Sequence, residues 1–178
     1  TPRERPTSAP ALSNAQIRFR TAALMLASVG GTAVYGKTHW WQDGFTGNFR
    51  STSEGWFGPS TSYGGADKLG HAMFAYVGTR LLANGFEWAG NDRGTALKLG
   101  LWTSVGTLLA VEVLDGYSKR WRFSKEDALA DIAGGALGYL LETRPALDAL
   151  IDLRIQYSRS TGPNGRRGFD PFGDYSGQ

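Results

Sequence analysis

The sequence predicts an all-α protein: a bundle of four main helices, a candidate short fifth helix, and a long aromatic loop between the first two helices. Four apolar segments are rich in Gly, Ala, Ser and Thr, the small residues that let helices approach closely. Capping and stop signals flank these segments. The segment between the first two helices has neither the period of a strand nor that of a helix. The four apolar segments are residues 21–36, 69–79, 99–111 and 132–141.

Local signals set the expected helix ends. Ser13 and Gln16 form a candidate capping box for the first helix, and Gly36 is a natural stop. Ser124 with Asp127 forms a capping signature for the fourth helix. Gly30 and Gly31 weaken this helix unless a bend or a close helix contact requires them. The expected helices are residues 14–35, 67–84, 95–115, 124–143 and 146–157, the last with Leu147, Leu150, Ile151 and Ile155 facing inward.

The length of 178 residues suits one domain with a sizeable core. Residues 1–12 contain three prolines and little to bury, so we expect a disordered leader or a linker. Residues 13–157 form the expected helical domain, and residues 158–178 form an irregular C-terminal segment rich in turn residues.

Composition excludes several classes of function. The net charge is only +3 and the basic residues form no long run, so the chain is not expected to bind nucleic acid. Without cysteine there is no disulfide, no thiolate zinc site and no cysteine nucleophile. The longest uncharged apolar run, residues 21–36, is shorter than the roughly 20 residues that span a bilayer comfortably. Two options stay open: a soluble or peripherally attached bundle, and partial insertion into a membrane.

The loop at residues 38–65 combines glycines with many aromatic residues. Irregular segments of this length are uncommon and are usually functional. Trp40, Trp41, Trp56 and Phe57 either cover one end of the bundle or anchor the chain at a membrane surface, where Trp is favoured.

Two pairs of acids interrupt apolar helix faces. Glu112 and Asp115 are three residues apart, and Asp127 and Asp131 are four apart, so each pair shares one face of its helix. Buried acids need partners, which predicts a polar cluster inside the bundle. The cluster is expected to comprise Asp67, Lys68, His71, Glu112, Asp115, Asp127 and Asp131.

Three interpretations of this cluster compete. In the first, Lys68, Asp127 and Ser124 belong to a structural polar network that fixes the helix register. In the second, His71 and carboxylates bind a metal; because neither HExxH nor paired Glu-x-x-His motifs occur, we expect no metal and no cofactor. In the third, His71 is the general base of a hydrolytic or transfer site. The candidate catalytic residues are then His71, Asp67, Glu112, Asp115 and Asp131.

Three sequence blocks occur in order along the chain: WFGPSTSYGGADKLGHAMFAY, EVLDGYSKRWRFSKEDALADIAGGALGYL and DYSGQ. They resemble the YfiM-like family of predicted bacterial periplasmic lipoproteins of unknown function. A weaker similarity, carried by a D-K-x-x-H helix, an acidic helix and an R-x-x-x-x-D helix, extends to VanZ-like membrane proteins of the cell envelope. The resemblance implies a helical core around the polar cluster and a location in the bacterial envelope, on the periplasmic side and associated with the membrane.

We therefore expect a non-enzymatic envelope protein, associated with the membrane, with a buried network of histidine, lysine and carboxylates. Its aromatic loop would contact membrane lipid or an envelope protein. The alternative is a hydrolase or transferase that acts on envelope lipid or glycan through His71 and the acids.

Overall fold

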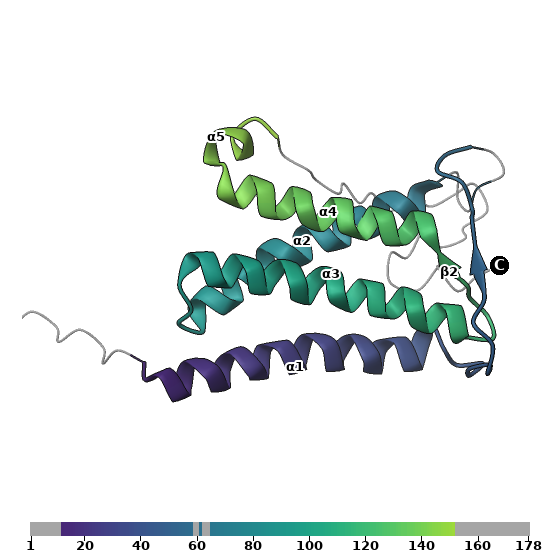
Figure 1. Cartoon of the computed structure of the whole chain (residues 1–178), viewed down its shortest axis with the longest axis horizontal. Coiled ribbons are helices and arrows are strands. Elements are labelled where there is room, and N and C mark those ends of the chain that lie inside the picture. The colour runs from purple at the N-terminus through teal and green to yellow at the C-terminus, as the bar shows by residue number, and fades with distance from the viewer. Residues whose placement is uncertain (1–11, 59–60, 62–64, 152–178) are drawn as a thin grey trace, which may run out of the picture.

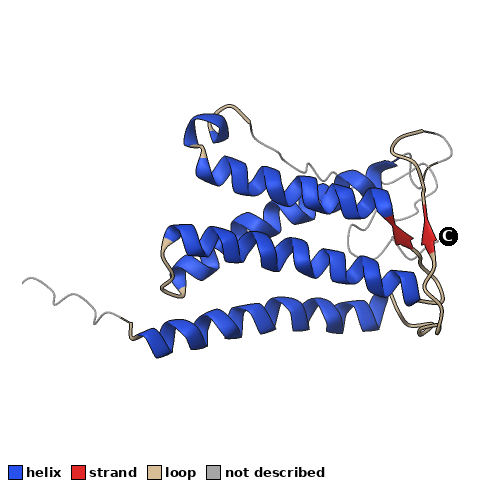
Figure 2. Cartoon of the chain, in the orientation of Figure 1, coloured by secondary structure: helices blue, strands red, loops and turns tan. Residues whose placement is uncertain are grey.

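The computed structural model describes residues 12–58, 61 and 65–151, and these residues form the expected all-α bundle with one two-stranded sheet (Figures 1 and 2). The outer limits of the predicted domains, residues 1–11 and the boundary between residues 157 and 158, lie outside the described residues. The elements are α1 (Asn14–His39), β1 (Ser51–Thr52), α2 (Ala66–Trp88), α3 (Arg93–Tyr117), β2 (Phe123–Ser124), α4 (Lys125–Thr143) and α5 (Pro145–Asp148).

The core lies between α2, α3 and α4, and α2 packs against both of the other two helices. Glycines on α4 make this packing close. A Cβ on Gly134 would overlap the carbonyl oxygen of Ala72, and a Cβ on Gly138 would lie 2.8 Å from the carbonyl oxygen of Tyr76. These contacts confirm the small-residue surface expected on the fourth helix, and they hold the middle of α4 close to α2.

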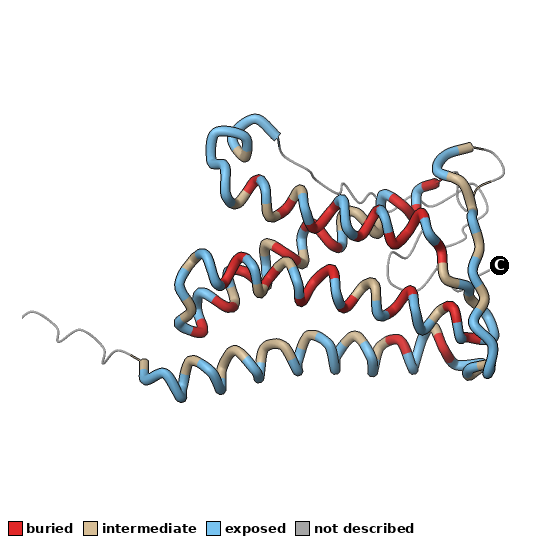
Figure 3. The backbone as a smooth tube through the Cα atoms, in the orientation of Figure 1, coloured by how far each residue is buried: buried red, intermediate tan, exposed pale blue. Residues whose placement is uncertain are grey.

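Helix α1 lies along the outside of this core, beside α3 (Figures 1 and 3). Its expected capping box is confirmed, because Ser13 accepts from the Gln16 amide and the Gln16 side chain accepts from the Ser13 amide. Gly36 does not end the helix as predicted. It is the one buried residue of α1, and a Cβ there would lie 2.5 Å from the ring of Trp41, so the glycine serves close packing.

Other helices also extend beyond their predicted ends. Helix α2 continues to Trp88 and stops before Gly90, whose φ of +105° favours glycine. Helix α3 begins two residues early, because Asp92 caps it by accepting from the Thr95 amide. Within the described residues the fifth helix spans only α5, and Leu150 is 81% exposed rather than inward-facing. Most of the fifth helix expected from the sequence, including Ile155, lies outside the described residues.

The loop between α1 and α2 is attached to the turn between α3 and α4. Strand β1 pairs in parallel with β2, with Ser51 opposite Phe123 and Thr52 opposite Ser124. The Arg50 side chain adds hydrogen bonds to three carbonyl oxygens of that turn, those of Ser118, Lys119 and Trp121. The sequence did not predict this sheet, because two-residue strands carry no periodic signal.

Candidate functional site

The predicted polar residues gather at the end of the bundle where α2 and α4 begin and α3 ends. Asp67, Lys68 and His71 come from the first two turns of α2. Glu112 and Asp115 come from the last two turns of α3, and the α4 residues follow its N-terminal cap. Antiparallel neighbours bring these helix ends together, so the structure assembles the cluster that the sequence predicted.

The first part of the cluster is a lysine cage, in which Lys68 is surrounded by Glu54, Asp67 and Asp127. Lys68 is 2% exposed. Its Nζ lies 2.7 Å from Glu54 Oε2, 2.8 Å from Asp67 Oδ2 and 3.3 Å from Asp127 Oδ1. Burial opposes the charged lysine, but these carboxylates outweigh it and raise the pKa of Lys68 above its usual value. The ammonium group is therefore held charged in the interior by its three acids.

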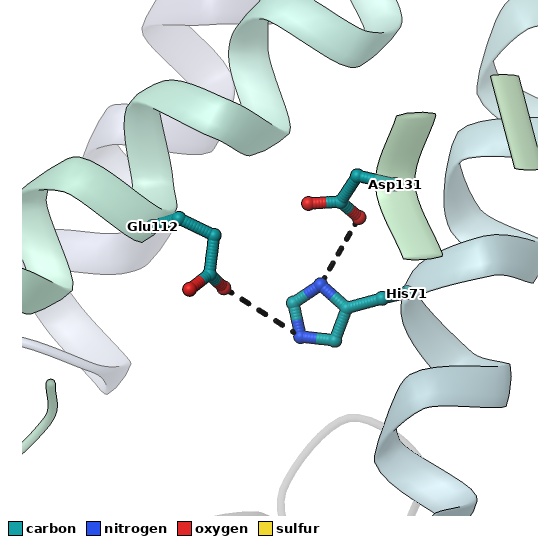
Figure 4. Close-up of side chains that lie close together, drawn as sticks. All are labelled: His71, Glu112 and Asp131. Carbon is teal, nitrogen blue, oxygen red and sulfur yellow. Dashed lines mark hydrogen bonds and ion pairs between the residues drawn. The ribbon is translucent and has the colours of Figure 1, made fainter. Parts of the chain in front are cut away.

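The second part is a triad formed by His71, Glu112 and Asp131 (Figure 4). The imidazole lies between the two acids, with Nδ1 at 3.0 Å from Asp131 Oδ1 and Nε2 at 3.8 Å from Glu112 Oε1. Glu112 also accepts from the Ser124 amide at the start of α4. Asp131 is fully buried, whereas the His71 side chain is 28% exposed. Asp131 is therefore inaccessible to solvent, whereas the imidazole of His71 can be reached from solvent.

Burial and charge set the protonation of this triad. Burial disfavours the charged imidazole, but the hydrogen bond and charge of Asp131 outweigh it and raise the pKa of His71 to about 9. Burial raises the pKa of Glu112 to about 8 against the attraction of His71, and it also raises the pKa of Asp131. At neutral pH the imidazole is therefore protonated, which suits a proton donor rather than the general base expected from the sequence.

The remaining predicted polar residues have structural roles in this conformation. Ser124 caps α4 by accepting from the Asp127 amide, as its spacing predicted. The carboxylate of Asp127 faces Lys68, so its side chain serves the cage. Trp41 donates from Nε1 to Asp115 at 2.5 Å, but burial outweighs this bond and raises the pKa of Asp115 to about 6.

The four aromatic residues expected to contact a membrane or a partner fall into two groups. Trp56 and Phe57 are exposed, at 47% and 62%. Trp41 is buried against Gly36, and Trp40 is half-buried at the end of α1. The expectation that Trp41 offers its ring to lipid is therefore wrong for this conformation, because that ring covers the end of the bundle.

Sequence reasoning missed Glu54 and a second ionic network. Glu54 reaches Lys68 from the loop, where Ser53 and the Glu54 amide both donate to Glu126. These contacts depend on the β1–β2 pairing, so no local sequence pattern predicts them. Near the opposite end of the bundle, Arg80 and Arg93 share Glu142, and Arg80 also pairs with Asp148. Arg80 is four residues from Tyr76, to which it donates, and that helical spacing is the one signal available in the sequence.

Both groups of acids have the composition of a cation site. His71, Glu112 and Asp131 each offer a ligand atom within 4.8 Å of the others, and so do Glu54, Asp67 and Asp127. In the second group the Lys68 ammonium already supplies the cation. His71 contacts two carboxylates, and among the described residues no hydroxyl group is hydrogen-bonded to it. The triad therefore lacks the arrangement of a serine hydrolase.

Exposed residues lie along all four long helices (Figure 3). Outside the cluster, large apolar side chains are among these exposed residues. On α1 the outward face carries Phe19, Leu26 and Val34, at 75%, 73% and 67% exposure. No charged residue interrupts residues 21–36, which extend about 24 Å along the helix. The outward faces of the other helices carry Phe74, Leu81 and Trp88 on α2, Trp102 and Val113 on α3, and Leu129, Ile132 and Leu140 on α4.

One helix in the described part of the chain, α3, is long and apolar enough to cross a bilayer on grounds of length and composition. Within its most apolar stretch, 39% of the residues are buried inside the protein. Core helices of soluble proteins meet the same criterion, so α3 alone is weak evidence for a membrane.

Comparison with known proteins gives one family. The family model described as "Predicted periplasmic lipoprotein (DUF2279)" matches residues 53–143, which include the lysine cage, the triad and helices α2 to α4. No curated protein and no solved structure matches the chain significantly. The matched residues cover half of the chain, and the description agrees with the expected location on the periplasmic side of the bacterial envelope. The chain therefore belongs to the DUF2279 family of predicted periplasmic lipoproteins.

Proposed function

We propose that this protein is a non-enzymatic envelope protein that binds membrane lipid through the outward apolar faces of its helices and the exposed rings of Trp56 and Phe57. The exposed face of α1 carries the proposal. A helix on the surface of a soluble bundle normally turns a polar stripe to water, whereas α1 turns Phe19, Leu26 and Val34 outward. Large exposed apolar surface of this kind is typical of membrane or protein contact.

The family supports lipid as the partner. A lipoprotein is held at a membrane by its acyl chains, so the apolar faces of its bundle lie close to a bilayer. The similarity to YfiM-like and VanZ-like envelope proteins, carried by the blocks around Asp67 and Asp127, agrees with this position. Lys37 lies in the last turn of α1, and in this proposal its charge would meet lipid headgroups.

The polar cluster supports a structural role in this function. Lys68 and its three acids join the loop, α2 and α4, so they hold the bundle end together. A networked set of buried charges of this kind fixes which helices pack together.

Vesicle co-sedimentation tests the proposal. The 178-residue chain contains no cysteine that could carry an acyl group. Binding of this chain to phospholipid vesicles would therefore come from its side chains. Each large side chain that enters hydrocarbon contributes about 1.5–3 kcal/mol. The triple variant Phe19→Ser, Leu26→Ser, Val34→Ser should therefore lose most of the binding.

Two further variants sharpen the test. Trp56→Ser with Phe57→Ser should weaken binding, whereas Leu147→Ser with Leu150→Ser, exposed side chains at α5, is the matched control and should change it little. Circular dichroism shows whether each variant is folded. A wild-type chain that stays in the supernatant at every lipid concentration would refute the proposal.

A second candidate function is a hydrolase or transferase on envelope lipid or glycan that uses His71. One observation favours it: the imidazole is protonated, oriented by Asp131 and 28% exposed, so it can reach a ligand as a proton donor. Hydrolysis of lipid or glycan substrates that depends on His71, while vesicle binding survives His71→Gln, would select this candidate.

A further inference from the structure

We propose that His71, Glu112 and Asp131 form a binding site for a divalent transition-metal ion. The three side chains come from three different helices, and one imidazole nitrogen and two carboxylate oxygens lie within 4.8 Å of one another. One imidazole with two carboxylates is a donor set that suits Zn²⁺ or Mn²⁺. The sequence carries no metal-binding motif at this site, because ligands drawn from separate helices have no fixed spacing along the chain.

An unsatisfied buried oxygen points to a missing cation. Asp131 is fully buried, and no donor among the described residues lies within hydrogen-bonding distance of its Oδ2. Figure 4 shows this second oxygen directed towards the Glu112 side of the triad, away from the bond to His71. A buried carboxylate oxygen without a partner is costly, and a cation beside it would remove that cost.

The charge of the whole cluster also favours a bound cation. Several acids gather at this end of the bundle, among them Glu54, Asp67, Glu112, Asp115, Glu126, Asp127 and Asp131. Among the described residues the ionic partners of these acids are Lys68 and His71. Each part therefore has more acids than cations. In the triad two acids share one imidazole, and protons or a metal ion must offset the remaining negative charge.

The spacing of the ligand atoms is close to that of a bound site. Two ligands at about 2.1 Å from one ion lie about 3.0–3.4 Å apart at right or tetrahedral angles. His71 Nδ1 and Asp131 Oδ1 are 3.0 Å apart. Glu112 Oε1 lies 3.8 Å from the other ring nitrogen, Nε2, and one ligand atom from each of the three side chains lies within 4.8 Å of the others, so the side chains must draw together to share one ion. The partial exposure of His71 provides an entry path from solvent.

Binding of Zn²⁺ and of Mn²⁺, each added alone, tests the site. The protein is first freed of its affinity tag and treated with chelator, and each ion is then titrated in by calorimetry at neutral pH. We expect saturable binding of a single ion per chain. At a free ion concentration of about a hundred times the dissociation constant, the melting temperature should rise by roughly 5–10 °C.

Asp131→Asn should weaken binding by roughly tenfold or more, because it removes a charged ligand but keeps the shape of the side chain. Glu142→Gln is the matched control, since Glu142 is a partly buried acid paired with Arg80 and Arg93 at the other network. The exposed His39, which stacks on Tyr35, gives a second control as His39→Gln.

If circular dichroism shows that Asp131→Asn is unfolded, Glu112→Gln provides the same test of the site. Affinity that is unchanged in a folded Asp131→Asn or Glu112→Gln chain would overturn the proposal, and so would the absence of saturable binding of either ion to the wild type. These outcomes are independent of vesicle binding, which uses the outward faces of the helices.

Discussion

Replacing Lys68 with methionine should destabilise the protein strongly, because it leaves three acids without their shared cation. Methionine nearly preserves the volume of the side chain, so the change is chiefly electrostatic. Removing one partner of a buried ion pair costs about 3–5 kcal/mol. Glu54 is partly exposed, with 27% of its side chain accessible, and water screens it. We therefore expect the lower value, about 3 kcal/mol, and a melting temperature lower by roughly 6–12 °C.

The pH dependence of this loss of stability shows whether charge or packing causes it. The pKa of Lys68 is raised in the folded state, so its contribution to stability is fully present below the ordinary lysine value of about 10.5 and is lost only as the pH rises through the folded value. At neutral pH the whole effect is therefore present. In acid the three carboxylates of the variant take up protons, so its deficit relative to the wild type should shrink as the pH falls towards about 4.

Thermal melts followed by circular dichroism measure both effects. Lys98→Met is the control, because Lys98 is exposed on α3 and should shift the melting temperature little. A Lys68→Met protein that melts within about 2 °C of the wild type at neutral pH would show that the cage does not hold the bundle end together. A large deficit that stayed constant in acid would assign the loss to packing instead of charge.

Gly134→Ala should destabilise by about 1–3 kcal/mol in urea unfolding, because its Cβ would overlap the Ala72 carbonyl oxygen; an unchanged midpoint would contradict the close helix contact. Gly30→Ala should instead stabilise by roughly 0.5–1 kcal/mol, since a Cβ there meets nothing within 4 Å in the described structure. Trp41→Phe should raise the pKa of Asp115 above its value of about 6, because the carboxylate loses its indole donor; NMR titration of Asp115 measures this, and a fall in that pKa would refute the assigned bond.

The sequence predicted best those features that local spacing determines. The capping box at Ser13 and the cap at Ser124 are confirmed because each depends on residues three positions apart. The helical spacing of the acids correctly placed Glu112 and Asp131 on inward faces. These signals sufficed to predict the helices and most members of the cluster.

Features that depend on contacts between distant segments could not be predicted in this way. Gly36 has the sequence signature of a helix stop, but the ring of Trp41 packs against it and the helix continues to His39. Glu54 joins the cage only because the loop is paired with the turn before α4. Trp41 is a residue type that anchors proteins at membrane surfaces, but its indole donates to Asp115 on another helix and faces inward.

The position of α1 outside the core affects which part of the protein unfolds locally. Between its ends α1 buries no residue; near its start Thr21 accepts from Asn91, and at its end Gly36 packs under Trp41. The family match begins at residue 53 and so does not include α1. In native-state hydrogen exchange we expect the amides of α1 to exchange together, at a lower opening free energy than those of α2 to α4. Helix α1 would then be a separate cooperative unit, able to leave the core and dock again while the polar end stays folded.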